Sequence, residues 1–219
     1  RSTLFPYTTL FRSLFMRAVV GRIAHLPAMP RTCLRLRQAM AAPDPSVRDI
    51  SRIIYDDPAV AAKVLQVVNS AFFRLARRMT NIEQAVGYLG FNAVRTLVLS
   101  VEISSAWRSD AAACAELNPE CLQSRAQRVA AAARALASGT SIADDALLAG
   151  LLHNIGYWVL MRECPQQLNG ALDIARTQGI PLHAAERESI GASHAEIGAY
   201  LLGLWGLPYP VIEAVAFQH

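Results

Sequence analysis

The sequence predicts an all-α protein, folded as a multi-helix bundle of two sub-bundles. Apolar residues make up 53% of the 219 residues. Alanine dominates the stretches with helical periodicity, whereas continuous runs of valine, isoleucine and threonine are scarce. Signals that start helices recur so regularly that the whole chain divides into helices without any strand. No sustained heptad pattern, repeat or glycine-rich phosphate loop suggests another class of fold.

Capping signals set the expected helix boundaries. Ser46, Thr80 and Ser193 each precede an acidic residue by three positions, which is the pattern of a capping box. Asp57-Pro58 and Asn118-Pro119 combine a capping side chain with proline at the first helical position. Helices are expected to end near Gly90, Gly139, Gly179 and Gly206. The resulting helices lie near 14–25, 31–42, 46–55, 58–70, 81–89, 92–107, 119–138, 143–161, 165–178 and, as a final group, from 182 onward.

The expected helix at 143–161 is apolar on nearly every face and opens at Ser141-Ile142-Ala143-Asp144, where the serine and the aspartate can cap its start. A helix of this length is too short to cross a bilayer and suits the centre of a bundle. It contains His153 and Asn154, which are therefore expected to be buried or to line a cleft. As buried polar groups, they are expected to form hydrogen bonds inside the core.

The chain is expected to form a single domain over 14–219, with an N-terminal helical part at 14–110 and a second part at 111–219. The polar, alanine-rich stretch from Ser109 to Pro119 marks the boundary between the two parts. Residues 1–13 lack helical periodicity and resemble the translation of a sequencing-library adapter, so they are interpreted as an artefact outside the fold. The last residues have the pattern of a helix that continues, so the sequence is expected to be truncated at its C-terminus.

Charge and cysteine content exclude several functions. The net charge is only +4, Lys63 is the sole lysine, and the arginines are scattered among acidic residues, so nucleic-acid binding is not expected. The four cysteines form no C-x-x-C pair, and no signal peptide or run of eighteen apolar residues is evident. These features predict a cytoplasmic protein that does not associate with a membrane. No serine or cysteine lies in a recognisable nucleophile motif.

Several short motifs occur together in a specific order. The N-terminal half contains Leu26-Pro27-Ala28-Met29-Pro30, Asp57-Pro58, Asn69-Ser70-Ala71-Phe72-Phe73, the stretch from Ile82 to Gly90, and Asn92-Ala93-Val94-Arg95. The C-terminal half contains Gly150-Leu151-Leu152-His153-Asn154-Ile155-Gly156, the stretch from Glu186 to Gly198, and Trp205-Gly206-Leu207-Pro208. In this order the motifs resemble the HDOD family, bacterial output domains related to HD-type phosphohydrolases. The resemblance covers nearly everything after residue 13.

The resemblance implies an all-α domain whose C-terminal half is HD-like. In catalytic HD relatives, an adjacent histidine and aspartate bind divalent metal, and a further histidine comes from an earlier helix. This sequence has Asn154 after His153 and Gln123 at about the position of the earlier histidine. A neutral amide cannot neutralise or bridge metal ions as a carboxylate does. Gln123, His153, Asn154 and His194 are therefore interpreted as a degenerate HD site, with no catalytic residue, metal or cofactor.

The remaining histidines are weaker candidates. His194 lies near an expected helix start, where it could be a residual metal ligand but is more simply a partial cap. His219 corresponds to a third candidate in the catalytic relatives. His25 and His183 are interpreted as loop or helix-end residues without a partner.

A second candidate region follows the helix at 58–70. Asn69 is expected to cap that helix and Ser70 to satisfy a neighbouring backbone group, while Val60, Val64, Val67 and Val68 face the core. The alternative is a surface for a partner or ligand, formed by Asn69, Ser70, Phe72, Phe73, Arg74, Arg77 and Arg78. Three arginines beside aromatic residues are more typical of a protein contact than of a nucleic-acid groove.

The sequence thus predicts a bacterial, non-catalytic HDOD-type regulatory domain, a pseudo-enzyme that acts through protein contacts or transmits a signal from a domain outside this chain. Two alternatives stay open. One is a metal-dependent phosphohydrolase that acts on a nucleotide or cyclic dinucleotide. The other is a sensor that has lost its metal but binds a small nucleotide.

Overall fold

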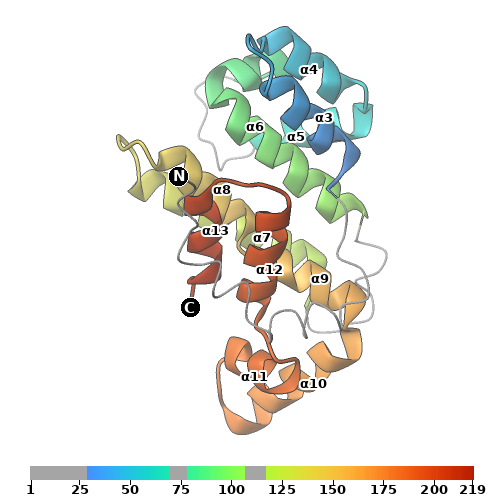
Figure 1. Cartoon of the computed structure of the whole chain (residues 1–219), viewed down its shortest axis with the longest axis vertical. Coiled ribbons are helices and arrows are strands. Elements are labelled where there is room, and N and C mark those ends of the chain that lie inside the picture. Colours follow the sequence, from blue (N-terminus) through green and yellow to red (C-terminus); the bar gives the residue numbers. More distant parts are fainter. Residues whose placement is uncertain (1–28, 70–77, 107–116) are drawn as a thin grey trace, which may run out of the picture. The chain divides into compact units, whose positions relative to one another are not determined.

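The structure is a computed structural model that describes residues 29–69, 78–106 and 117–219. Every regular element in these ranges is a helix, which confirms the predicted fold class. The helices are α3 (Arg31–Met40), α4 (Val47–Tyr55), α5 (Pro58–Val68), α6 (Ile82–Ala106), α7 (Pro119–Leu136), α8 (Ala143–Leu152), α9 (Ile155–Glu163), α10 (Pro165–Gln178), α11 (Leu182–Ser189), α12 (His194–Leu204) and α13 (Tyr209–Ala216) (Figure 1). The expected helix at 14–25 lies outside the described residues.

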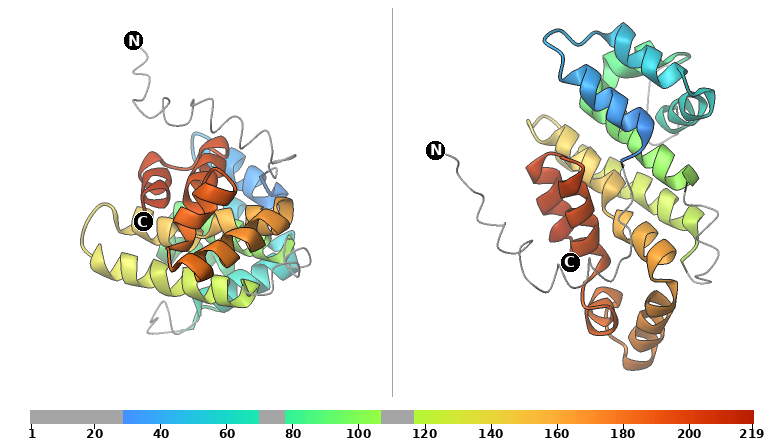
Figure 2. Two further views of the ribbon diagram at one scale, coloured as in Figure 1. Left: turned by 90° about the horizontal axis from the view of Figure 1, so that it is seen from below. Right: turned by 45° about the vertical axis from the view of Figure 1, so that its right-hand side comes forward.

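The chain divides into two compact units, and the boundary falls between Leu152 and His153. The first, called here the α3–α8 unit, consists of residues 28–109 and 119–152. The second, the α9–α13 unit, includes residues 153–219. The expected boundary at 110/111 differs from this division, because α7 and α8 belong with the helices that precede them. Their close pairing, visible in Figure 2, and the contact of α8 with α6 place them there.

Helix α6 is the centre of the α3–α8 unit, where α3, α4, α5 and α8 all pack against it. Its apolar side chains, such as Val94, Leu97 and Val98, are buried. Gly90 interrupts the helical geometry with φ 80° and ψ 166°, a conformation that glycine adopts readily and residues with a Cβ atom avoid. The two helices expected at 81–89 and 92–107 therefore form one element with a break where the sequence predicted their separation.

Most predicted helix starts are confirmed. The Ser46 side chain accepts a hydrogen bond from Asp49 N–H, and that of Asp57 accepts from Ala59 and Val60 N–H. Ser193 forms a complete capping box with Glu196 at the start of α12. The prediction for Thr80 was wrong by one residue: the Asn81 side chain accepts from Gln84 N–H, and the Gln84 side chain accepts from Thr80 N–H.

The single helix expected at 143–161 is two helices. Helix α8 ends at Leu152, and α9 begins at Ile155. Asn154 at the junction has φ −94° and ψ 7°. Nearly all residues from Leu147 to Met161 are nevertheless buried, so the expected core position of this segment is confirmed. The helix is interrupted at His153 and Asn154, two of the four residues that the sequence analysis assigned to a degenerate site.

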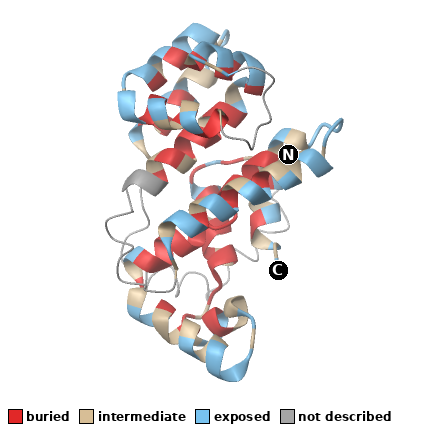
Figure 3. Ribbon diagram, turned by 180° about the vertical axis from the view of Figure 1, so that it is seen from behind, coloured by how far each residue is buried: buried red, intermediate tan, exposed pale blue. Residues whose placement is uncertain are grey.

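The α9–α13 unit depends on a close approach of α9 and α12. A Cβ atom added to Gly156 would lie 1.8 Å from the backbone oxygen of His194, so only glycine fits there. A Cβ atom added to Gly198, one turn further along α12, would lie 3.1 Å from the backbone nitrogen of Gly156. Figure 3 shows how buried and exposed residues are distributed along the helices, as amphipathic helices around a core require. The backbone contact between α9 and α12 fixes the position of His194.

One described helix, over Ile82–Ile103, is long and apolar enough by length and composition alone to cross a membrane. The sequence analysis anticipated no apolar run of this length. Of its most apolar window, 56% is buried inside the protein, and the core helix of a soluble protein meets the same criteria.

Candidate functional site around His194

The candidate site is built around a buried pair of side chains, His194 and Glu186. His194 is the first residue of α12 and is 1% exposed, and Glu186 on α11 is fully buried. The Glu186 Oε2 atom accepts a hydrogen bond from the His194 backbone N–H at 2.7 Å and lies 2.7 Å from its Nδ1 atom. The carboxylate thus holds both the backbone and the ring of His194.

The bond to Glu186 determines where the hydrogens of His194 lie. An ionised carboxylate can only accept hydrogen bonds, so the Nδ1 atom of His194 carries the hydrogen that faces Glu186. In a neutral ring the Nε2 atom is then an acceptor. The Nε2 atom of His219 lies 3.0 Å from it and is the donor in this tautomer. Glu186, His194 and His219 therefore form a chain that can hold one proton between the two Nε2 atoms.

Aromatic contacts complete the cluster. The Tyr157 ring of α9 stacks on His194 at a centroid distance of 3.8 Å. His183, on α11, stacks on His219 at 4.3 Å with an interplanar angle of 9°. The interpretation of His183 as a residue without a partner was wrong, because its partner lies thirty-six positions later in the sequence. His25 lies outside the described residues.

The surroundings of His219 lower the pKa of its imidazole. Loss of water around the ring has the largest effect, followed by the nearby rings of His194 and His183, which disfavour a further positive charge. Glu186 acts in the opposite direction, and Arg187 lowers the pKa slightly. His219 therefore stays neutral to lower pH than a free imidazole does.

His153 and Asn154 lie at the junction of α8 and α9 and are buried, as predicted, with exposures of 9% and 4%. The backbone oxygen of His153 accepts a hydrogen bond from the Gln218 side chain at 2.9 Å, and His153 has further contacts. Asn154 makes no side-chain cap to α9, and its Nδ2 atom is buried without a hydrogen-bond partner. The expected hydrogen bonding in the core is thus incomplete at Asn154. Glu186 likewise has a buried Oε1 atom without a partner.

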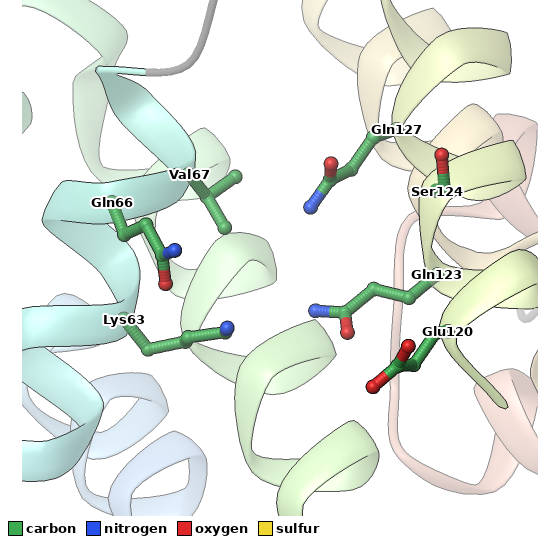
Figure 4. Close-up of a pocket in the computed structure, with 7 residues that line it drawn as sticks. All are labelled: Lys63, Gln66, Val67, Glu120, Gln123, Ser124 and Gln127. Atoms are coloured by element: carbon green, nitrogen blue, oxygen red, sulfur yellow. The ribbon is translucent and has the colours of Figure 1, made fainter.

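Gln123 lies in the α3–α8 unit, on α7. Its half-buried side chain lines a polar groove between α5 and α7, together with Lys63 of α5 (Figure 4).

An HD-type metal centre needs several anionic or imidazole donors directed at one point. Asn154 supplies only a neutral amide, while His194 contacts Glu186 through Nδ1 and His219 through Nε2. In the ranges that the structure describes, no three histidine, cysteine, aspartate or glutamate side chains are grouped as ligands of one ion. With an amide at position 154, the donors around His153 lack the adjacent carboxylate of an HD-type metal centre.

The second candidate region runs from Asn69 to Arg78, and the structure describes only these two end residues. Asn69 is the C-cap of α5, and its side chain bonds both the N–H and the C=O of Met79, at 2.7 and 2.8 Å. This agrees with the structural role expected for Asn69, and the four valines of α5 are buried as predicted. Arg78 is exposed. The other members, Ser70, Phe72, Phe73, Arg74 and Arg77, lie outside the described residues.

Sequence reasoning singled out His194 but missed Glu186 and Tyr157. The expectation that His194 is a partial cap was wrong, because Ser193 caps α12 and the His194 ring binds Glu186. Glu186 and Ala185 are the two buried residues of Leu182–Ser189, whereas Arg187 and Glu188 are exposed. In the sequence, only the neighbouring alanine distinguishes Glu186 from an exposed glutamate. That signal is weak in a sequence.

Comparison with known proteins identifies the family of the chain. The HDOD domain family model matches residues 26–219. The chain belongs to the HDOD domain family. It is also 31% identical over 205 residues to an uncharacterized protein of Treponema pallidum (strain Nichols), and the match covers 92% of this chain and 39% of that protein. The chain thus spans well under half the length of this relative.

Solved structures share the fold. An HDOD domain protein of unknown function from Geobacter sulfurreducens has a TM-score of 0.77 at 23% identity, over 96% of this chain and 70% of that one. A protein from Shewanella amazonensis SB2B, whose name proposes a phosphohydrolase, has a TM-score of 0.74 at 26% identity, over 92% and 71%. A protein from Marinobacter aquaeolei VT8, whose name proposes a role in signal transduction, has a TM-score of 0.71 at 23% identity, over 100% and 51%. The first and third likenesses show the fold alone.

Proposed function

We propose that this chain is a non-catalytic regulatory domain that acts through protein contacts or transmits a signal within a longer protein. Membership of a family of output domains supports this proposal, as does the greater length of the Treponema relative, which leaves room for other domains. The proposed setting is the bacterial cytoplasm. The expected partner is a protein, or another domain of the same polypeptide.

The observation that carries the proposal is the chemistry of Asn154. Its side chain is buried next to His153, where a catalytic relative would have an aspartate, and its amide nitrogen has no hydrogen-bond partner. A carboxylate at this position would carry the negative charge that a divalent cation needs, whereas the amide carries none. His194, the other histidine of the degenerate site, contacts Glu186 through Nδ1 and His219 through Nε2. The neutral amide at Asn154 is the feature that favours a non-catalytic role.

The test compares metal content and hydrolysis in three forms of the chain: unaltered, Asn154→Asp and His153→Ala. We expect the unaltered chain, purified from metal-replete cells, to contain no stoichiometric divalent metal by plasma mass spectrometry. We also expect no turnover of bis(4-nitrophenyl) phosphate, a general phosphodiester probe. Stoichiometric manganese, iron or zinc that disappears in His153→Ala, together with turnover, would contradict the proposal. Metal uptake only by Asn154→Asp would identify the Asn154 amide as the reason why the unaltered chain binds no metal.

The second candidate function is a metal-dependent phosphohydrolase. It is favoured by the Shewanella protein, which is 26% identical and whose name proposes that activity. This function predicts that the same measurements detect bound metal and hydrolysis of a nucleotide or cyclic dinucleotide. The nucleotide-sensing alternative predicts neither, but it predicts a higher melting temperature with one nucleotide of a panel, because a ligand selective for the native state stabilises it.

A further inference from the structure

The α3–α8 unit contains a polar groove between α5 and α7. Helix α5 has only two polar side chains, Lys63 and Gln66, in the sequence Pro58–Val68, and both line this groove. The opposite wall is one face of α7, on which polar residues recur at helical spacing: Glu120, Gln123, Ser124 and Gln127. Both helices thus direct their polar faces toward the same space, which encloses about 280 Å³.

Lys63 is the strongest feature of the groove. It is the sole lysine in a chain with twenty-one basic residues. Its side chain is half-buried and extends across the groove toward Gln123 and Glu120 (Figure 4). Among the residues that the structure describes, it has no hydrogen-bond or ion-pair partner. A half-buried ammonium group without an ion-pair partner is well placed to bind an anion.

The other groups in the groove limit which anion fits. Three glutamine amides and the Ser124 hydroxyl offer both donors and acceptors. Glu120 adds a negative charge, so the formal charges of the described lining residues sum to zero. A phosphomonoester, with a charge of about −1.5 to −2 at pH 7, would be repelled by Glu120 after Lys63 has been neutralised. A single carboxylate would not, and a carboxylate oxygen of Glu120 has acceptor capacity for a donor on the ligand.

The size and lining of the groove agree with a small, polar ligand. Ligand pockets commonly have volumes of roughly 300–1,000 Å³ and mostly apolar walls. This groove, at about 280 Å³, lies just below that range, and Val67 is the only apolar residue among its described lining. None of the lining side chains that the structure describes is aromatic, so none of them offers a ring to stack on a nucleobase.

We propose that the α5–α7 groove binds a small monocarboxylate that also carries an amine or hydroxyl group, such as an amino acid or a hydroxy acid. The carboxylate pairs with Lys63, the amine or hydroxyl donates to Glu120, and the glutamine amides bond the remainder. The site uses residues of the α3–α8 unit only. It is therefore independent of the proposed function and of the chemistry around His194.

The test is a thermal-shift screen of the full chain, followed by titration calorimetry. The probes are the standard amino acids, glycolate and lactate, with acetate, inorganic phosphate and adenosine monophosphate for comparison. We expect at least one amino acid or hydroxy acid to bind more tightly than acetate, and phosphate and the nucleotide not to bind. Binding of phosphate or the nucleotide in preference, or no binding by any amino or hydroxy acid, would overturn the proposal.

Variants locate the binding. Lys63→Met retains most of the side-chain stem and should weaken binding about tenfold or more, because a hydrogen bond to a charged group contributes about 1.5–3 kcal/mol. Glu120→Gln should reduce the preference for the amino or hydroxy acid over acetate. Arg128→Met, on the same helix but outside the groove, is the matched control and should bind as the unaltered chain does. Gln127→Leu provides a second test if Lys63→Met does not fold. Equal affinity in the groove variants and the control would refute the site.

Discussion

At the scale of single residues, the buried Glu186 carboxylate connects α11 to the first turn of α12. One of its oxygens holds two N–H groups of His194, and the other has no hydrogen-bond partner. We expect Glu186→Gln to lower the free energy of unfolding by about 2–3 kcal/mol, because one amide oxygen replaces a charged acceptor and the amide N–H₂ gains no partner. Urea denaturation followed by circular dichroism measures the change.

Glu188→Gln is the matched control, because Glu188 is on the same helix and is exposed. It should change stability by less than about 0.5 kcal/mol. Similar values for the two variants would mean that the contact between Glu186 and His194 contributes little to stability.

His219 should give the folded chain a dependence on pH. Its pKa in the folded chain lies below the ordinary value of about 6.5, mainly through loss of water and then through His194 and His183. The unfolded chain therefore binds a proton first as the pH falls. The contribution of His219 to the free energy of unfolding is complete above about pH 6.5 and is lost as the pH falls through its pKa in the folded chain.

Nuclear magnetic resonance titration of the imidazole signals tests this expectation. The His219 signal should titrate below pH 6.5, and its pKa should rise in His183→Gln, which removes one of the neighbouring rings. A His219 pKa at or above that of a free histidine, or one unchanged by His183→Gln, would contradict the stacked arrangement.

At the scale of helices, α3 has a cap that comes from another helix. Pro30 precedes α3 and offers no side-chain cap, but the Glu102 carboxylate of α6 accepts from Thr32 N–H at 3.4 Å and from Cys33 N–H at 3.3 Å. Loss of a helix cap typically costs about 1 kcal/mol. We expect Glu102→Ala to lower the unfolding free energy by about that amount.

The capping role of Glu102 has a local readout. Hydrogen exchange at the amides of Thr32 and Cys33 should accelerate in Glu102→Ala more than exchange in α4 does. Burial and Glu102 also raise the pKa of the Cys33 thiol, so the substitution should lower that pKa. Uniform acceleration throughout the unit would mean global destabilisation and no cap.

Gly156→Ala tests the backbone contact of α9 and α12. The added Cβ atom would lie 1.8 Å from the His194 backbone oxygen, so the two helices would have to separate. We expect a loss of about 3 kcal/mol in unfolding free energy, at the upper end for overpacking. Gly170→Ala, whose Cβ atom would meet only the Ser189 Oγ atom at 3.7 Å, should be neutral or slightly stabilising. Equal effects of the two substitutions would argue against the close approach.

Helix starts could be predicted from the sequence where the signal is local. Ser46, Asp57 and Ser193 bond backbone groups two or three residues away, so the residues that make the cap are neighbours in the sequence. The break at His153 and Asn154 could not be predicted in the same way. The stretch from Leu147 to Met161 contains no proline, and its apolar character suits one helix as well as two. The α9 helix is positioned by Gly156 against α12, a contact that only the folded chain makes.

At the scale of the whole molecule, the division into two units predicts where each substitution acts. Gly156→Ala should accelerate hydrogen exchange in α9 and α12 and leave α4 and α5 little changed, because local opening follows cooperative units. Exchange measured by mass spectrometry, in dilute urea, resolves the helices. Equal acceleration in α4 and α5 would show that the two units unfold as one.

The packing of the helices also explains how much of the site could be predicted from the sequence. The family motifs directed attention to His153, Asn154 and His194, and all three are buried in the α9–α13 unit. Glu186, Tyr157 and His183 surround His194 or His219 only because α9, α11, α12 and the residues after α13 converge. A sequence pattern shows which residue types are present but not which distant side chains meet.

The presence of a single lysine in the α5–α7 groove also makes the chain convenient for covalent labelling. An amine-reactive ester has one side-chain target, Lys63, in addition to the N-terminal amine. A fluorophore or crosslinker attached there would report on the groove without any engineered cysteine. Peptide mapping distinguishes the two amines, so the rate of Lys63 modification would measure how often solvent reaches the space between α5 and α7.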